Sequence, residues 1–161
     1  MIVLFASFCK PDAASRHETA WWLLKNGARK LFGIPDICEK TVRNAAGKPF
    51  NPEFPGIFFS ISHTKNAAFC VFSDAPIGLD CEEMRPVSER VCGSYLGGAR
   101  DDREALERWT KLESLVKLRG VTFAEVSYER DVSHPESVVF ERLPCPLGKE
   151  FIVHVCYFRK S

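Results

Sequence analysis

The chain has 161 residues, of which 45% are hydrophobic and 27% charged, and this composition predicts one globular domain with a sizeable core and excludes a disordered chain. Its 22 basic and 21 acidic residues leave a net charge of +1, so we expect no nucleic-acid or membrane partner attracted by overall charge. Seven cysteines, an odd number without a C-x-x-C pair, predict free thiols in a reducing compartment, and we expect a cytoplasmic protein with no signal or membrane-spanning segment.

The first half of the sequence has the pattern of a strand, a long helix and a hairpin. The expected elements are a strand at residues 2–8, a helix at 13–32, and paired strands at 57–61 and 67–72. Ser15 is expected to cap the helix, with Glu18 completing a capping box. Between the helix and the hairpin, residues 43–56 form a loop rich in Gly and Pro, and a loop of this length favours a functional role.

The second half of the sequence repeats this coarse order. The expected elements are a strand at residues 77–82, a weakly patterned helix at 87–96, a clear helix at 101–118, and strands at 121–130, 137–143 and 150–159. Asp101 is expected to cap the clear helix, and Gly120 to end it. A long helix among strands in each half predicts an α+β fold of two similar halves, residues 1–75 and 76–161, with a ligand cleft between them.

Two acids stand at alternate positions of the strand expected at residues 77–82. Because side chains alternate along a strand, Asp80 and Glu82 should point to the same face. For two acids alone, a strand that runs out into solvent is the preferred interpretation. Gly78 shifts the balance, because a glycine inside a strand often marks the close approach of a ligand or another backbone.

An acid and a base lie four residues apart in the clear helix. Glu113 and Lys117 should be neighbours on one face, at the edge of the apolar stripe where a helix meets a cleft. An isolated Glu is usually a surface residue, but partial burial would require a partner, either Lys117 or a metal. Glu113, Asp80 and Glu82 together form an all-oxygen donor set that suits Mg²⁺ and a substrate phosphate.

A second group of residues could hold an anion. His63 follows Ser62 in the turn of the expected hairpin, and Lys48 precedes Pro49 in the long loop. Residues of this kind are by default solvated, but together they offer backbone N–H groups and positive charge to a phosphate. Arg16, near the start of the first helix, is by default solvated as well, with a supporting phosphate contact as the alternative.

Four of these stretches follow one another in a characteristic order. They read Gly-Lys-Pro at 47–49, Phe-Ser-Ile-Ser-His-Thr at 59–64, Ile-Gly-Leu-Asp-Cys-Glu at 77–82 and Trp-Thr-Lys-Leu-Glu-Ser-Leu-Val-Lys at 109–117. This series resembles the motifs of the phosphopantetheinyl transferases, of the monomeric type that activates peptide and polyketide synthases. The resemblance implies a pseudo-dimer of two α+β halves, each a small antiparallel sheet with a long helix, and an active site in the cleft between them.

The resemblance also implies an activity. It implies Mg²⁺-dependent transfer of the 4′-phosphopantetheine arm of coenzyme A to a serine hydroxyl of an acyl or peptidyl carrier protein. This is the reaction of a holo-acyl-carrier-protein synthase, which serves fatty acid, polyketide or nonribosomal peptide biosynthesis. The implied partners of this monomer are coenzyme A and the carrier protein.

By residue match, the implied metal ligands are Asp80, Glu82 and Glu113. Glu113 and Lys117 are implied as catalytic residues, and either Glu113 or a water on the metal would take the serine proton. The residues implied in binding coenzyme A are Arg16, Lys48, Pro49, Ser62, His63, Asp80 and Lys117.

One position departs from the family pattern. The family usually has a lysine immediately before the helix glutamate, and this chain has Leu112 there. Leu112 keeps open an alternative, a non-catalytic module of the same fold that binds coenzyme A or a carrier protein. A third interpretation is a structural or interaction domain in which the acids are surface residues.

Overall fold

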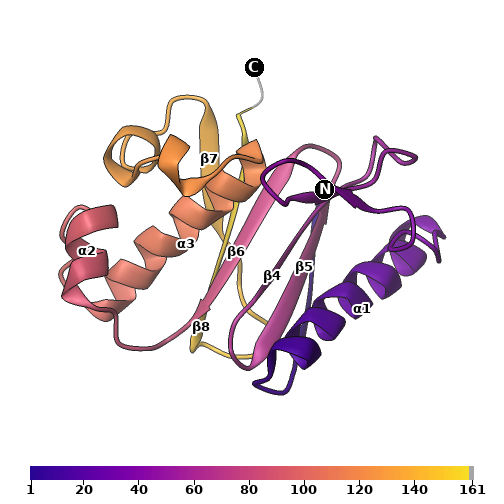
Figure 1. Ribbon diagram of the computed structural model, residues 1–161, viewed down its shortest axis with the longest axis horizontal. Helices are drawn as coiled ribbons and strands as arrows, with labels where there is room; N and C mark the ends of the chain where they lie inside the picture. Colours follow the sequence, from indigo (N-terminus) through magenta and orange to yellow (C-terminus); the bar gives the residue numbers. More distant parts are fainter. Residues whose placement is uncertain (160–161) are drawn as a thin grey trace.

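Stretches rich in Val, Ile, Phe and Cys form the main strands of the computed structural model, which describes residues 1–159 (Figure 1). One three-stranded antiparallel sheet consists of β1 (Ile2–Phe8), β4 (Phe58–His63) and β5 (Ala67–Ser73), and the other of β6 (Ile77–Glu83), β7 (Val138–Arg142) and β8 (Phe151–Phe158). The shorter elements are β2 (Val42–Arg43), β3 (Pro49–Phe50) and α2 (Glu89–Tyr95). This mixture confirms the α+β class.

Each sheet carries one long helix, α1 (Ala13–Phe32) or α3 (Asp102–Arg119), and the two halves share one order of main elements. The first half runs β1, α1, β4, β5 and the second runs β6, α3, β7, β8. In both sheets the last strand of the half is the central one, with orders β1-β5-β4 and β6-β8-β7. The division into residues 1–75 and 76–161 stays a prediction, and residues 160 and 161 lie outside the described residues.

Side-chain caps fix where the long helices begin. The Oδ1 atom of Asp12 accepts the N–H of Ser15 at 2.7 Å, so Asp12 and not the predicted Ser15 caps α1. The reason is backbone geometry, because Asp12 is extended while Ser15 already lies in the first helical turn, where its hydroxyl accepts the N–H of Lys10. Asp101 caps α3 as predicted and accepts the N–H of Glu104 at 2.8 Å.

The strand predicted at residues 121–130 is wrong. This stretch contains a 3₁₀ turn (Phe123–Glu125) and enters a π-helical turn (Tyr128–Val132). Both the backbone N–H and the hydroxyl of Thr122 donate to Oε2 of Glu125 at 2.9 Å. Local bonds between side chains and backbone offer the chain an alternative to a sheet ladder, and here they outweigh the alternating apolar pattern.

The two sheets pack face to face, and a helix covers the outer face of each. Phe69 of β5, Leu79 of β6 and Val153 of β8 are fully buried in the layer between the sheets. Leu24 of α1 and Leu115 of α3 are fully buried in the layers between each helix and its sheet. Figure 1 shows α1 and α3 on opposite sides of the strands β4, β5 and β6. Within residues 1–159, no helix combines the length and apolar character needed to cross a membrane.

The backbone of helix α3 lies directly against its sheet at Gly78. A Cβ at this position would overlap the backbone carbonyl oxygen of Ser114 and the backbone nitrogen of Leu118. The glycine in the strand therefore marks the approach of another backbone, one of the two reasons expected for it. In the first half the glycine is on the helix instead, since a Cβ at Gly27 would overlap the ring of Phe72.

Candidate active site

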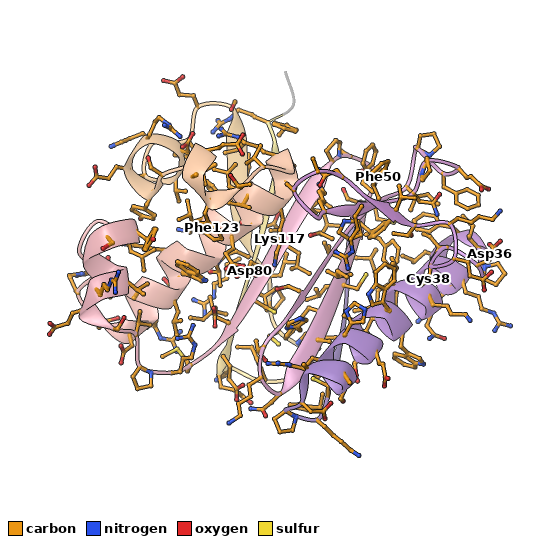
Figure 2. The ribbon with its side chains drawn as sticks, in the orientation of Figure 1. Asp36, Cys38, Phe50, Asp80, Lys117 and Phe123 are labelled. Atoms are coloured by element: carbon orange, nitrogen blue, oxygen red, sulfur yellow. The ribbon has the colours of Figure 1, made fainter. Side chains whose placement is uncertain are left out.

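A cleft of about 680 Å³ lies between the halves, where the edge strands β4 and β6 meet. Its other walls come from α3, the β2–β3 hairpin and the first turns of α1. The predicted site residues that line it are Lys48, Pro49, Ser62, His63, Asp80, Glu82, Glu113 and Lys117. Figure 2 shows Asp80 and Lys117 next to each other, with Phe123 nearby. Of the predicted set, Arg16 does not line the cleft, although its neighbour His17 does.

Asp80 is anchored from both halves and is only 3% exposed. Its Oδ1 atom accepts hydrogen bonds from Oγ of Ser62 at 2.8 Å and from Nζ of Lys117 at 2.6 Å. Lys117 also donates to Oγ of Ser62 at 3.0 Å, so one triangle of contacts joins β4, β6 and α3. The second carboxylate oxygen, Oδ2, is buried and accepts no N–H or hydroxyl hydrogen bond among the described residues, and the Glu113 carboxyl lies close enough to donate to Asp80 when it is protonated. Such an oxygen is unusual, because buried polar atoms are nearly always paired.

Glu113 lies one helical turn before Lys117, and its Oε2 atom is 3.7 Å from Nζ of Lys117, as the i,i+4 spacing predicts. Burial, and next the negative charge of Asp80, raise the pKa of Glu113 to about 8. Burial lowers the pKa of Lys117, but the charges of Asp80 and Glu113 outweigh this effect and raise it. The arrangement therefore keeps the ammonium charged and lets the Glu113 carboxyl exchange a proton near neutral pH.

Glu82 lines the cleft but has a partner of its own. Its carboxylate accepts hydrogen bonds from Nε of Arg85 at 3.3 Å and from Nη2 at 3.2 Å. Within residues 1–159, no group of three or more His, Cys, Asp or Glu side chains is arranged to hold a metal ion. The structure thus brings Asp80 and Glu113 together with Lys117, while Arg85 holds the third predicted ligand.

The donor set nevertheless fits a divalent cation. The Oδ2 atom of Asp80 lacks a partner, and the Glu113 carboxyl is crowded by the charge of Asp80. Lys117 supplies positive charge to both carboxylates but leaves Oδ2 unsatisfied. A hard cation binds carboxylate oxygens and removes the cost of placing two like charges together.

Positive groups gather on the first-half wall of the cleft. Burial, and next the charge of Arg16, lower the pKa of His63, with smaller contributions from Lys117 and His17. The Nε atom of Arg16 is buried and has no hydrogen-bond partner among the described residues. The unpaired Nε of Arg16 can donate a hydrogen bond to an anion, and the cationic groups near His63 attract negative charge. This part of the cleft therefore favours the binding of an anion.

Lys48 lines the cleft, but its ammonium group points elsewhere. Its Nζ atom donates to the carbonyl oxygens of Leu118 at 3.2 Å and Ile77 at 3.4 Å, and burial lowers its pKa. Leu112, the departure from the family motif, is 1% exposed in the core between α3 and its sheet. This position faces the core, so a cleft residue is not expected there.

Sequence reasoning missed several lining residues. Arg43 lies on the β2–β3 hairpin, where its Nη1 atom donates to the carbonyl oxygen of Gly47 at 2.7 Å. Phe123 stacks on Trp109, with ring centroids 5.2 Å apart. No spacing marks Arg43. Thr122 and Glu125, by contrast, stand at the spacing of a capping box, a signal for the turn that contains Phe123.

The chain is similar to curated proteins from Bacillus, and no family model matches it. It is 33% identical over 124 residues to a 4′-phosphopantetheinyl transferase of Bacillus subtilis, which covers 70% of this chain and 55% of that protein. It is 31% identical over 85 residues to 4′-phosphopantetheinyl transferase Sfp of Bacillus subtilis (strain 168), covering 46% of this chain and 38% of that protein. With 4′-phosphopantetheinyl transferase psf-1 of Bacillus pumilus, the identity is 23% over 137 residues, covering 76% and 58%.

The chain spans about half the length of the curated relatives it matches. These relatives support the 4′-phosphopantetheinyl transferase superfamily, which the four sequence motifs predict.

Proposed function

We propose that this chain transfers the 4′-phosphopantetheine arm of coenzyme A to a serine hydroxyl of an acyl or peptidyl carrier protein, with Mg²⁺, as a holo-acyl-carrier-protein synthase does. The observation that carries the proposal is the buried Oδ2 atom of Asp80, without a partner among the described residues and beside the crowded carboxyl of Glu113. The carboxylates of Asp80 and Glu113 would repel the negative charge of a pyrophosphate. A cation bound between them would remove this repulsion and let the pyrophosphate bind in the cleft. The relatives' shared name supports the same group transfer.

The first-half wall is assigned to the phosphates of coenzyme A. Arg16, close to His63 but outside the cleft lining, supplies positive charge there, and His63 supplies an imidazole. Ser62, whose hydroxyl donates to Asp80, and Pro49 border the cleft. A phosphate next to His63 would raise the pKa of the imidazole, because a nearby negative charge favours the protonated form. We assign no phosphate to Lys48, since its ammonium group donates to two carbonyl oxygens.

The second-half wall is assigned to the metal. Asp80 and Glu113 would hold Mg²⁺, joined by Glu82 after its carboxylate leaves Arg85. When bound, Mg²⁺ would stabilise the charge that develops on the transferring phosphoryl group. Lys117 would then no longer be the counter-ion of both carboxylates, and its ammonium could pair with a phosphate.

In the proposed reaction, the serine oxygen bonds to the phosphorus that bears the pantetheine arm. The bond from this phosphorus to the bridging oxygen of the pyrophosphate breaks, and adenosine 3′,5′-bisphosphate leaves with the electron pair. The serine proton would go to Glu113 or to a water on the metal, the two bases that the family resemblance leaves open. Lys117 offers its positive charge to the phosphoryl oxygens.

We further propose that the molecule is a monomeric pseudo-dimer. The shared strand order of the two sheets supports two related halves, each a small antiparallel sheet with a long helix. The seven cysteines are free thiols, which supports the reducing environment of the cytoplasm as its place.

A non-catalytic module that binds coenzyme A or a carrier protein is the competing proposal. Its support is that Lys117 already pairs with Asp80 and Glu113, and that Glu82 already pairs with Arg85. A chain that has lost catalysis could keep such an internally paired site as part of its fold.

The test is to incubate the chain with coenzyme A, Mg²⁺ and an apo carrier protein, and then to measure the mass of the carrier. We expect the mass to increase by one phosphopantetheine group with the unmodified chain and with Glu18→Gln, an exposed acid on α1, but not with Glu113→Gln. Failure to modify any of several carriers, while coenzyme A still binds, would favour the non-catalytic module.

A further inference from the structure

The β2–β3 hairpin of the first half reaches across to the C-terminal end of α3 in the second half. Nδ2 of Asn44 donates to the carbonyl oxygen of Gly120 at 3.2 Å. Nζ of Lys48 donates to the carbonyl oxygens of Leu118 at 3.2 Å and Ile77 at 3.4 Å. Two side chains of one hairpin therefore bind the last turn of α3 and the first residue of β6.

The hairpin is held in shape by its own hydrogen bonds. The Oδ1 atom of Asn44 accepts the backbone N–H groups of Ala46 at 3.1 Å and Lys48 at 2.9 Å. The backbone N–H of Asn44 donates to the carbonyl oxygen of Lys48 at 3.0 Å, and that of Gly47 donates to the carbonyl oxygen of Asn44 at 2.9 Å. Because these bonds fix the loop, the amide of Asn44 and the ammonium of Lys48 are presented to α3 by a preformed support.

The partners of the hairpin are the groups that a helix leaves unsatisfied. The last carbonyl groups of a helix have no partner within it, and its C-terminus carries partial negative charge that a cation stabilises. Gly120 has the left-handed conformation that ends a helix, with φ of 65°. A Cβ on Gly120 would lie 2.6 Å from Nδ2 of Asn44, so the close fit of the hairpin also depends on this glycine.

The position of these contacts links them to the cleft. Lys48, Pro49 and Gly120 line both the main cleft and a second cavity of about 260 Å³ behind it, so the hairpin forms the partition between them. Lys117 lies in the last turn of α3, and Glu113 lies one turn earlier. A displacement of this end of α3 would move Lys117 relative to Asp80.

We propose that the β2–β3 hairpin is a clasp between the halves, in which Asn44 and Lys48 hold the end of α3 and thereby position Lys117 and Glu113 in the cleft. Lys48 is then a positioning residue and not a phosphate ligand. The contacts of Asn44 and Lys48 with α3 exist without substrate. The proposal therefore rests on the proposed function only for the statement that Lys117 and Glu113 act on coenzyme A.

The test is amide hydrogen exchange of the chain without coenzyme A, comparing Lys48→Met with the unmodified chain. The N–H groups of Gly120 and Val121, which donate to the carbonyl oxygen of Val116, should exchange at least about tenfold faster in the variant. The equivalent amides at the end of α1, those of Gly33 and Ile34, should not change.

Matched variants separate the clasp from a general loss of charge. Lys30→Met removes an exposed cation from the last turn of α1 and should leave the amides at the end of α3 unchanged. Asn44→Ala should accelerate the same two α3 amides, and Lys48→Arg should restore most of their protection. If Lys48→Met fails to fold, Asn44→Ala carries the test alone.

Affinity for coenzyme A separates the two roles of Lys48. If Lys48 is a phosphate ligand, Lys48→Met should leave the exchange of the Gly120 and Val121 amides unchanged in the free protein. The variant should also bind coenzyme A more weakly, with a difference that disappears at high salt. This result would overturn the proposal. Since exchange is measured without substrate, the clasp can be confirmed even where no carrier protein is modified, and refuted even where one is.

Discussion

Strands β1 and β6 occupy the same place in their sheets, at an edge and paired with the last strand of their half, but only β6 carries charge. β1 consists of apolar and small residues, whereas β6 contains Asp80, Glu82 and Glu83. The same contrast holds for the helices at the cleft, since α3 contributes Glu113 and Lys117 while α1 contributes His17 and Ala20. If the proposed function holds, one topology serves two tasks, anion binding on the first-half wall and charge chemistry on the second.

The two halves also differ in how helix and sheet approach each other. In the second half the space is made by Gly78 on the strand, which lets the backbone of α3 lie against β6 next to Asp80. In the first half it is made by Gly27 on the helix, opposite the Phe72 ring. The glycine in β6 lets α3 lie close enough for Lys117 to contact Asp80. Among the described residues, no ion pair between α1 and its sheet corresponds to this contact.

The largest effect should come from the acids of the second half. We expect Asp80→Asn and Glu113→Gln each to lower the rate of carrier modification by about 10³-fold or more without unfolding the chain, because each removes charge that acts at the reacting phosphate. His63→Ala, in the first half, should mainly raise the KM for coenzyme A. Steady-state kinetics checks this division, and full activity of either acid variant would refute the metal assignment.

The next largest effect should be the loss of stability when a methyl group is added at Gly78, where α3 lies against β6. Gly78→Ala should lower the free energy of unfolding by about 3 kcal/mol or more, because the methyl group meets backbone atoms of Ser114 and Leu118 that cannot rotate away. Gly27→Ala should cost about 1–2 kcal/mol, since it meets a side-chain ring that can shift.

Urea unfolding of these two variants measures the difference between the halves. Gly93→Ala is the matched control, because a Cβ on this α2 glycine meets no atom within 4 Å, and its stability should change by less than about 1 kcal/mol. An equal cost at Gly78 and Gly93 would mean that α3 does not lie against β6 as described.

The counter-ion of the second half can be removed directly. Lys117→Met leaves the carboxylates of Asp80 and Glu113 without their ammonium partner and should lower the stability by about 2–3 kcal/mol in the absence of Mg²⁺. Mg²⁺ should then raise the melting temperature of this variant more than that of the unmodified chain, because it binds the carboxylates without having to compete with Lys117. Thermal melts with and without Mg²⁺ check this, and Lys30→Met should show no such gain.

A smaller effect should appear in the pH dependence of stability. Because the folded-state pKa of Glu113 lies at about 8, above its unfolded value, its contribution to stability is complete below about pH 4.5 and is lost as the pH rises through 8. Between pH 6 and pH 8.5 the metal-free chain should lose about 2–2.5 kcal/mol more than Glu113→Gln does. Urea unfolding in chelator at several pH values checks this, and parallel curves would contradict it.

Local patterns predicted the elements whose signals are contained within one segment. The stripe and cap of α3, the hairpin of β4 and β5, and the i,i+4 pair of Glu113 and Lys117 all follow from spacing alone. The prediction failed at residues 121–130, where side-chain hydrogen bonds to the backbone compete with an alternating pattern, and it placed the cap of α1 on Ser15 instead of Asp12.

Contacts between distant segments could not be predicted from spacing. Lys48 binds a carbonyl group 70 residues further along the chain, and a motif identifies the lysine but not its partner. Glu82 follows the expected alternation and lines the cleft with Asp80, but its pairing with Arg85 depends on which rotamers the surrounding loop allows. The convergence of Asp80, Ser62 and Lys117 also needed the two sheets to be placed relative to each other.

The most direct test of the account is a calorimetric titration of coenzyme A, with and without Mg²⁺, on the unmodified chain and on Asp80→Asn. The account predicts that Mg²⁺ tightens binding to the unmodified chain by at least about tenfold, a gain of about 1.4 kcal/mol, and has little effect on the variant. Equal affinity with and without Mg²⁺, or an equal gain in both proteins, would contradict the claim that the cleft acids need a cation before a pyrophosphate can bind.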